Sequence, residues 1–284
     1  MMSKFFSSLY RRSRHRWLYP LISLTVTLGL CLGVPMVTQA GSLGDLILQG
    51  VQVFQLSNMS DKREIALGTE INEQITRQVR LYKEPAINEY VNKMGQRLAA
   101  KSSRPKIPYT FQVVDDNGVN AFATMGGYVY VNTGLLKLAD NEAQVASVVG
   151  HEIGHIARRH SIKQMRELAI ARGIATAAGL DRNTAVGLGV ELALRRPNSR
   201  KDEYEADQEG LKNMGASGYA QYEMISFFQK LLAQSRGSTP TFLSTHPDTK
   251  NRIARIQQSI DPVKSKVGDG LDKVAYRAKI KTLL

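Results

Sequence analysis

The 284-residue sequence predicts an α+β fold, a mainly helical domain that contains one small β-sheet. Apolar residues recur at helical spacing over most of the chain from residue 61 onward, which indicates amphipathic helices. Two stretches, YTFQVV at 109–114 and YVYVN at 128–132, have the aromatic and β-branched content of strands. The segment GHEIGHIARRH at 150–160 holds three of the five histidines and lies within one predicted helix.

The N-terminal segment has the pattern of an export signal. Four arginines precede an uncharged run from Leu21 to Val37, and small residues follow up to Ala40. We therefore expect residues 1–40 to be an export signal or an N-terminal membrane anchor, since residues 18–37 approach the length that spans a bilayer. A lipid anchor on Cys31 is the weaker alternative, because Leu30 stands where lipoprotein signals have a small residue. The protein is expected in the periplasm or another extracytoplasmic, lumenal space.

The composition narrows the choice of partners. The chain carries a net charge of +13, of which +8 remains after residue 40. A basic exported protein can meet an anionic membrane surface, and we expect that partner rather than nucleic acid, because the basic residues are scattered and no nucleic-acid motif is present. A plain solvated surface is favoured over either partner. The only cysteine lies in the signal, so no disulfide is expected in the rest of the chain.

The helices and strands are expected in the following order. Amphipathic helices cover 61–82 and 85–100, and the strands at 109–114 and 128–132 follow, separated by the turn DDNG, the segment VNAFAT and a glycine pair. The alternation of the second strand predicts one buried and one accessible face. Asp140 is a suitable N-cap for a long helix from Asn141 to about Ala169.

The second half is expected to be helical. The short apolar segments LAIARGIATAAGL and TAVGLGVELAL predict buried or cleft-covering helices, with a membrane-dipping hairpin as the alternative. Residues 199–235 predict one or two helices. A last helix is expected at 252–260, followed by a basic C-terminal tail, residues 261–284.

The histidine cluster has the spacing of a metal site. Residues four apart on a helix lie about 40° apart around its axis, so His151 and His155 project from one face. Glu152 points to the adjacent quadrant, where its carboxylate can reach a metal-bound water, the arrangement of HExxH metallopeptidases. His160 lies more than a third of a turn away from that face and is expected to be structural. A solvated helix with a chance match is the alternative.

A third protein ligand must come from elsewhere, because Arg158 and Ser161 do not match the metzincin motif. The segment SRKDEYEAD at 199–207 offers it. Glu203 and Asp207 share a helix face, so Glu203 can complete a zinc site while Asp207 orients a ligating histidine from behind. Glu205 is the alternative ligand, although it points to nearly the opposite side.

Four segments together resemble the membrane-associated gluzincin peptidases of the HtpX, BepA and OMA type, a family that also includes the CAAX prenyl-protein endopeptidases. The resemblance covers about residues 66–260 of a domain at 41–284 and rests on the segments NAFATMGGYVYVNTGLL, VGHEIGHIARRH, SRKDEYEAD and STHPDTKNRI. It implies a gluzincin metallopeptidase domain with one Zn²⁺ per chain, polypeptide substrates, and a small β-sheet whose edge strand borders the zinc site.

The resemblance also implies residue roles. His151, His155 and Glu203 would bind zinc, Glu152 would be the general base, and Asp207 would support a ligand. The edge strand that receives substrate would consist of Gly127, Tyr128, Val129, Tyr130 and Val131. His246 and Arg252 match the family's His-Pro loop, from which His246 would cap the zinc at rest or assist catalysis.

Some features depart from the family. Met125 replaces a common proline, and the large hydrophobic spans of HtpX and the helical repeats of BepA are missing, so the chain resembles a short, exported, single-domain branch. The leading functional hypothesis is a zinc endopeptidase that cleaves misfolded or unassembled envelope proteins. The alternatives are a chaperone-like assembly factor that rarely cleaves and, on charge alone, a basic surface-binding module. The oligomeric state stays open.

Overall fold

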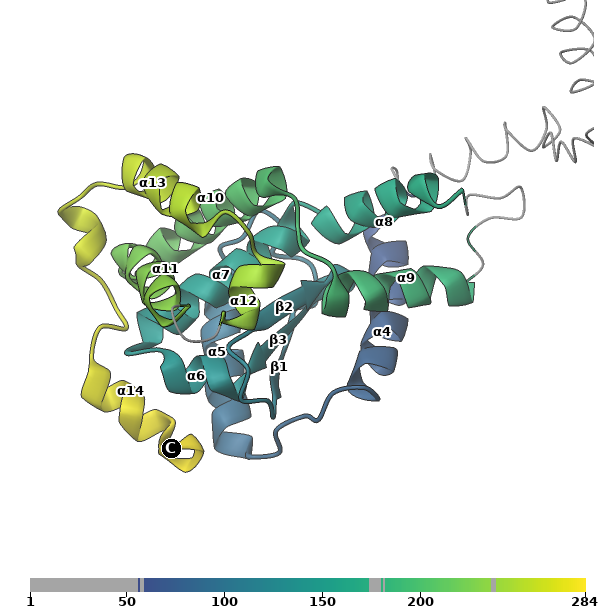
Figure 1. Cartoon of the computed structure of the whole chain (residues 1–284). Coiled ribbons are helices and arrows are strands. Elements are labelled where there is room, and N and C mark those ends of the chain that lie inside the picture. Colours follow the sequence, from purple (N-terminus) through teal and green to yellow (C-terminus); the bar gives the residue numbers. More distant parts are fainter. Residues whose placement is uncertain (1–55, 57–58, 174–179, 181, 236–238) are drawn as a thin grey trace, which may run out of the picture. The chain divides into compact units, whose positions relative to one another are not determined.

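The structure is a computed structural model that describes residues 56, 59–173, 180, 182–235 and 239–284, all within one compact unit (Figure 1). The predicted export signal and part of the segment LAIARGIATAAGL lie outside the described residues. Within the described ranges, every helix is too short or too polar to serve as a membrane span.

The predicted α+β class is confirmed, since helices surround a small three-stranded sheet (Figure 1). The strands are β1 (Thr110–Val114), β2 (Ala121–Thr124) and β3 (Tyr128–Asn132). The α-helices are α4 (Asp61–Thr76), α5 (Pro85–Ala99), α6 (Thr133–Leu138), α7 (Glu142–Ala157), α8 (His160–Ala171), α9 (Arg182–Arg195), α10 (Arg200–Ala216), α11 (Tyr222–Gln234), α12 (Thr241–Thr245), α13 (Thr249–Ser259) and α14 (Lys273–Lys279).

The strand order β1-β3-β2 corrects the expected edge strand. β3 lies in the centre, parallel to β1 and antiparallel to β2, so Tyr128–Val131 are paired on both sides. The strand at the edge nearest the histidines is β2, whose Phe122 and Ala123 line a cavity shared with Glu152 and His155. A tight turn between β2 and β3 brings about this order, because Gly126 and Gly127 adopt φ values of 79° and 104° that favour glycine.

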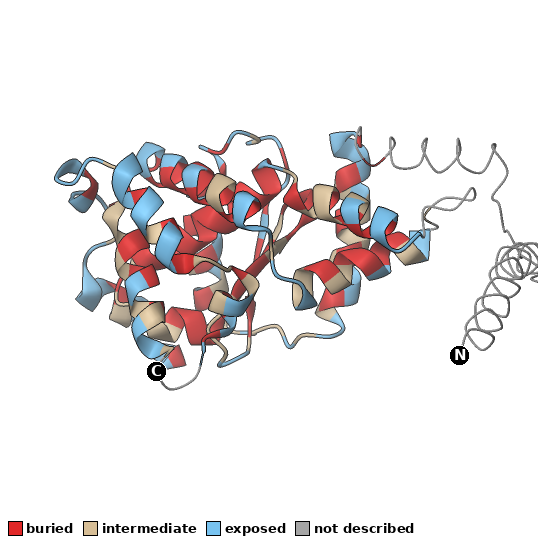
Figure 2. Cartoon of the chain, turned by 45° about the horizontal axis from the view of Figure 1, so that its top comes forward, coloured by how far each residue is buried: buried red, intermediate tan, exposed pale blue. Residues whose placement is uncertain are grey.

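Both faces of the sheet are covered, which also differs from the expected accessible face. Val129 and Val131 join a core with α5 and α7, whereas Tyr130, on the opposite face, joins a second core with α4, α8 and α9. Figure 2 shows buried residues running through the sheet and the helices on either side of it. Alternate residues of β3 therefore face two different cores, whereas the sequence predicted one core and one solvent-accessible face.

The predicted long helix from Asn141 to Ala169 is interrupted. Asn141, not Asp140, is the N-cap, and its side-chain oxygen accepts a hydrogen bond from the Gln144 N–H at 3.0 Å. α7 ends at Ala157 and α8 begins at His160, because Arg159 adopts the left-handed conformation with φ 57°. This break redirects His160, with consequences described below.

The C-terminal part is helical and partly packed into the core. Residues 199–235 form two helices, and α13 begins three residues before the predicted start. The segment predicted as a basic tail contains α14, whose Tyr276 is buried and donates a hydrogen bond to the Leu136 carbonyl at 2.5 Å. The Gly270 carbonyl accepts a hydrogen bond from the Ala143 N–H in the first turn of α7. The segment after α13 thus helps to hold the N-terminal end of α7, the helix that carries His151 and His155, in place.

Candidate metal centre

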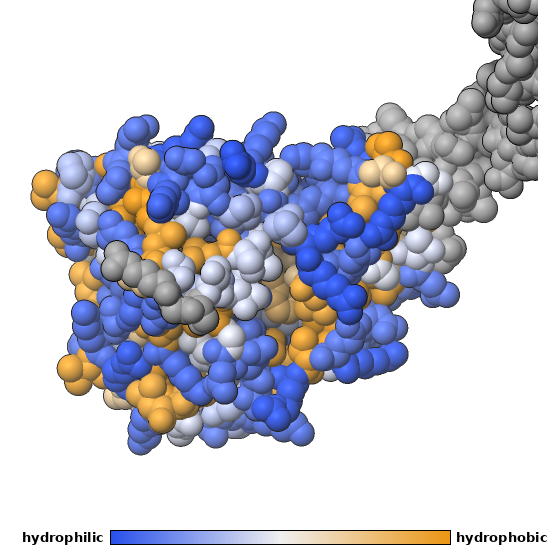
Figure 3. Space-filling view, in the orientation of Figure 1, coloured by the Kyte–Doolittle hydropathy of each residue, from blue (hydrophilic) through white to orange (hydrophobic). Residues whose placement is uncertain are grey.

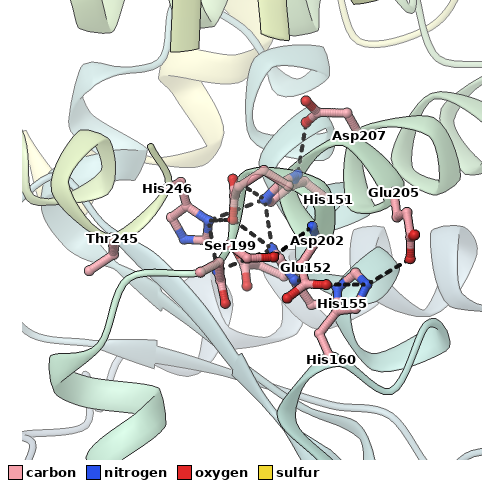
Figure 4. Close-up of polar contacts among 12 residues, drawn as sticks. His151, Glu152, His155, His160, Ser199, Asp202, Glu205, Asp207, Thr245 and His246 are labelled. Atoms are coloured by element: carbon pink, nitrogen blue, oxygen red, sulfur yellow. Dashed lines mark hydrogen bonds and ion pairs between the residues drawn. The ribbon is translucent and has the colours of Figure 1, made fainter. Parts of the chain in front are cut away.

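Three elements bring four buried side chains together (Figure 4). α7 supplies His151 and His155, α10 supplies Glu203, and His246 follows α12. The Nε2 atom of His151 lies 3.0 Å from His155 Nε2 and 3.2 Å from His246 Nδ1. The Oε1 atom of Glu203 lies 3.3 Å from His155 Nε2 and 3.1 Å from His246 Nδ1.

These distances fit a tetrahedral metal site. Ligands at about 2.0–2.1 Å from a tetrahedral zinc ion are separated by roughly 3.3 Å from one another, close to the separations in this cluster. The donor set of three imidazoles and one carboxylate is also one that zinc prefers. The predicted ligands His151, His155 and Glu203 therefore converge on one metal site, and His246 joins them as a fourth donor.

His151 is held from behind by a carboxylate. Its Nδ1 lies 2.9 Å from Asp207 Oδ1, so Asp207 takes the supporting position expected from the sequence. Burial and the Arg252 charge oppose protonation, but Glu203 and Asp207 raise the pKa of His151 to about 9. The surroundings of this imidazole thus favour positive charge, which a bound metal ion would supply.

His155 sits in a different environment. Burial lowers its pKa to about 3, which keeps the imidazole neutral and available as a ligand. The Nδ1 atom faces His160 Nδ1 at 2.8 Å. Glu205, the alternative ligand, does not enter the metal cluster; its Oε2 lies 3.2 Å from His160 Nε2 instead.

Arg252 lies behind the cluster, fully buried. Its guanidinium donates two hydrogen bonds to Asp207, at 2.8 and 2.7 Å, and lies 2.7 Å from Glu203 Oε2. Burial alone would raise the pKa of Glu203, but His246 and Arg252 hold it well below the usual range. Glu203 therefore stays ionised and able to bind a metal.

Glu152 faces a small cavity beside the cluster. The cavity has a volume of about 30 Å³, enough for one water molecule. The carboxylate is 1% exposed, and its Oε1 atom has no hydrogen-bond partner among the described residues, although His246 Nε2 lies 3.5 Å away. Burial raises the pKa of Glu152, which makes the carboxylate a stronger base.

Asn198 is a residue of the site that sequence reasoning missed. Its Nδ2 lies 3.4 Å from both His155 Nε2 and His246 Nδ1, and its backbone N–H donates to the Thr245 carbonyl at 3.1 Å. The loop before α10 is thereby joined to the loop that carries His246. The signal that could have found Asn198 is the break RRPNS before α10, which places a polar loop next to the predicted ligand helix.

The comparisons with known proteins agree with this geometry. The family model of peptidase family M48 matches residues 85–260, more than half of the chain. The chain belongs to peptidase family M48. Its M48 domain is that of a metalloendopeptidase, in which His151, His155, Glu203 and His246 form the metal-binding cluster.

Curated M48 relatives match most of this chain but only part of their own length. The β-barrel assembly-enhancing protease of Escherichia coli is 30% identical over 80% of this chain and 50% of its own. The putative β-barrel assembly-enhancing protease of Vibrio cholerae is 29% identical over 79% of this chain and 49% of its own. Mitochondrial metalloendopeptidase OMA1 of Schizosaccharomyces pombe is 30% identical over 60% of this chain and 52% of its own. The chain thus spans about half the length of these relatives.

Proposed function

We propose that this M48 metalloprotease is a zinc-dependent endopeptidase that acts outside the cytoplasm on misfolded or unassembled envelope proteins. The arrangement of Glu152 beside the cluster of His151, His155 and Glu203 carries this proposal, because it places a buried base next to a metal site. The extracytoplasmic location is supported by the signal-like N-terminus and by the similarity to the β-barrel assembly-enhancing proteases. One Zn²⁺ per chain fits the single cluster of three histidines and a glutamate among the described residues.

Each side chain has a defined task in the proposed reaction. Zinc, when bound, would polarise the scissile carbonyl and lower the pKa of a water ligand. Glu152 accepts the proton of the attacking water at Oε1 and delivers it to the leaving amine. Asp207 fixes His151, and Arg252 keeps Glu203 and Asp207 ionised, so Arg252 is a positioning residue in this scheme.

The substrate is expected to add to β2 rather than to β3. Both edges of β3 are hydrogen-bonded within the sheet, whereas β2 is an outer strand of the described sheet and borders the cavity at Glu152. An extended peptide pairing with Ala121–Thr124 would lie beside the metal site. The residues Leu192 and Ala193 of α9 also line this cavity, so α9 covers the same region and has to move for a peptide to enter.

The closed site favours a second property, latency. His246 occupies a position in the metal cluster and stacks on Phe242, with ring centroids 4.2 Å apart. A 30 Å³ cavity has no room for a peptide. The protein at rest would then cleave rarely until His246 leaves the cluster. Once α9 has moved, it could bind an extended chain without cleaving it, as a chaperone-like assembly factor does.

The surface offers a site for the expected membrane contact. Val263, Val267 and Val274 are 73–81% exposed, and each is next to a lysine, at 264, 266 and 273. Apolar groups stand among hydrophilic ones along the left edge of Figure 3, which the segment between α13 and α14 follows in Figure 1. Apolar and basic side chains together suit an anionic lipid surface.

The proposed activity is tested by comparing wild type with Glu152→Gln. Zinc content and cleavage of casein, or of a denatured membrane protein, are measured on the same samples of the full chain. We expect about one zinc per chain in both proteins and cleavage by wild type alone. Zinc in both without cleavage by either would support the latent, chaperone-like alternative, and complementation of a deletion strain by Glu152→Gln would support it further. No zinc in either protein would refute the proposal.

A further inference from the structure

The two metal-binding histidines of α7 are supported differently on their outer nitrogens. His151 contacts a carboxylate, Asp207, whereas the Nδ1 atom of His155 meets the Nδ1 atom of a second histidine, His160, at 2.8 Å. His160 is 2% exposed, and its Nε2 atom lies 3.2 Å from Glu205 Oε2. Figure 4 shows His160 and Glu205 on the side of the metal cluster opposite His246.

The break between α7 and α8 creates this contact. On a straight helix, His160 would be rotated about 140° from His155 and could not reach it. Arg159 instead adopts a left-handed conformation, uncommon for a residue other than glycine. Its guanidinium is held by the Met59 carbonyl at 2.9 Å and by Asp61. The chain therefore maintains an unfavourable backbone conformation at the one residue that turns His160 back toward the ligand.

Only one proton arrangement suits the His155–His160 contact when a metal is bound. A ligand that uses Nε2 carries its proton on Nδ1, so His155 Nδ1 donates. His160 must then accept at Nδ1, which leaves its proton on Nε2. That N–H points to an acceptor, since Glu205 Oε2 is 3.2 Å and Asp202 Oδ1 3.7 Å away.

We infer that His160 is a positioning residue of the metal centre. It fixes the tautomer and orientation of His155, and through it the negative charge of Glu205 acts on His155. This relay of His155, His160 and Glu205 rests on the proposed function, because it requires a metal on His155. Hydrogen bonds to the outer nitrogen of a ligating histidine fix the ring and strengthen it as a ligand. Asp202 contributes less, since Lys163 already binds its Oδ1 at 2.5 Å.

A second cation is the competing explanation for the same residues. His160, Asp202 and Glu205 offer donor atoms that lie within 4.8 Å of one another, and Asp202 Oδ2 is buried without a hydrogen-bond partner among the described residues. The Lys163 ammonium, however, already supplies a positive charge at Asp202. The relay needs no further ion, and metal stoichiometry distinguishes the two explanations.

The relay is tested by the affinity of the full chain for Zn²⁺, measured by competition with a chromophoric chelator. We expect His160→Leu to weaken Zn²⁺ binding about 10–100-fold, as loss of such supporting contacts generally does. His160→Gln, whose amide can accept from His155 and donate to Glu205, restores much of the affinity. Glu205 is 38% exposed, so we expect Glu205→Gln to fold. Glu205→Gln weakens binding by less than His160→Leu and shifts the visible spectrum of the Co²⁺-loaded protein.

Met165→Ala is the matched control, because Met165 is fully buried in α8 and packs in the second core. It lowers the melting temperature and leaves Zn²⁺ affinity unchanged. Equal Zn²⁺ affinity of wild type and His160→Leu, or an equal loss in Met165→Ala, would overturn the relay while the metal centre stands. Two zinc ions per wild-type chain and one in Glu205→Gln would replace the relay with a second metal site. Wild type without zinc would overturn both the relay and the proposed function.

Discussion

The contact between α7 and α10 leads to a sharp prediction for Gly154. These two helices carry His151, His155 and Glu203, and they approach closely where Gly150 and Gly154 of α7 face the backbone of Gly210 and Ala206 in α10. A Cβ atom at Gly154 would lie 2.6 Å from the Ala206 carbonyl oxygen and 2.9 Å from its Cα. Both are backbone atoms, so no side chain can rotate away, and an ordinary contact of 3.4 Å requires the helices to separate by about 0.8 Å.

Gly150, one turn earlier, supplies the control. A Cβ atom there has its nearest neighbour, the Gly210 carbonyl oxygen, at 3.4 Å, which is an ordinary contact. Alanine is favoured over glycine in a helix by about 1 kcal/mol, so Gly150→Ala is expected to stabilise the protein by up to that amount. Overpacking costs about 1–3 kcal/mol, of which the helix preference for alanine offsets up to about 1 kcal/mol, so Gly154→Ala is expected to lose up to about 2 kcal/mol net. Ligand positions tolerate a displacement of only about 0.5 Å, so Gly154→Ala should also bind zinc more weakly.

Two measurements test this reasoning. Urea unfolding in the presence of chelator gives the free energies of the metal-free proteins, and chelator competition gives their Zn²⁺ affinities. We expect the two variants to lie on opposite sides of wild type in stability, and only Gly154→Ala to lose Zn²⁺ affinity. If Gly154→Ala is as stable as Gly150→Ala and binds zinc as tightly, the helix contact does not set the geometry of the ligands.

Three further predictions follow from the described contacts. Arg252→Met is expected to cost about 3–5 kcal/mol in urea unfolding, because the buried carboxylates of Glu203 and Asp207 lose their cation; a loss under about 1 kcal/mol would contradict this role. The pKa of Glu142 is lowered, since hydrogen bonds from Lys279 and from two tyrosines outweigh its burial. Its stabilising effect is therefore present above the ordinary carboxyl pKa of 4.5 and is lost as the pH falls below that value. The unfolding free energies of wild type and Glu142→Gln should differ at pH 7 and converge in acid, and a constant difference would exclude the carboxylate as the cause. Removal of metal by a chelator should lower the melting temperature of wild type more than that of Glu203→Gln, and equal shifts would place the metal elsewhere.

Much of the candidate site was predictable because it depends on local spacing. His151 and His155 share a face on any α-helix, and the same holds for Glu203 and Asp207, so two helices already define the ligands. The structure confirms that these four residues meet. The fold class was predictable for a similar reason, since helical and strand periodicities are local properties of the sequence.

The features that were wrong or missed depend on distant contacts. β3 was expected at the edge, but its position depends on which strands pair with it, and nothing in its own residues determines that choice. The end of α7 depends on the left-handed conformation of Arg159, which is held by residues about a hundred positions earlier. The contact of His160 with His155 follows from that break, so periodicity alone assigned His160 to the wrong side. Asn198 lies in a loop whose position only the fold determines.

The order of the site residues along the chain restricts when the enzyme can become active. The centre needs His151 from the middle of the sequence and Arg252 from near its end, which lie 101 residues apart. The first turn of α7 also contacts Gly270. During synthesis, the N-terminal part of a chain emerges first. The metal centre therefore cannot be completed until the segment that carries His246 and Arg252 has emerged, about a hundred residues after His151.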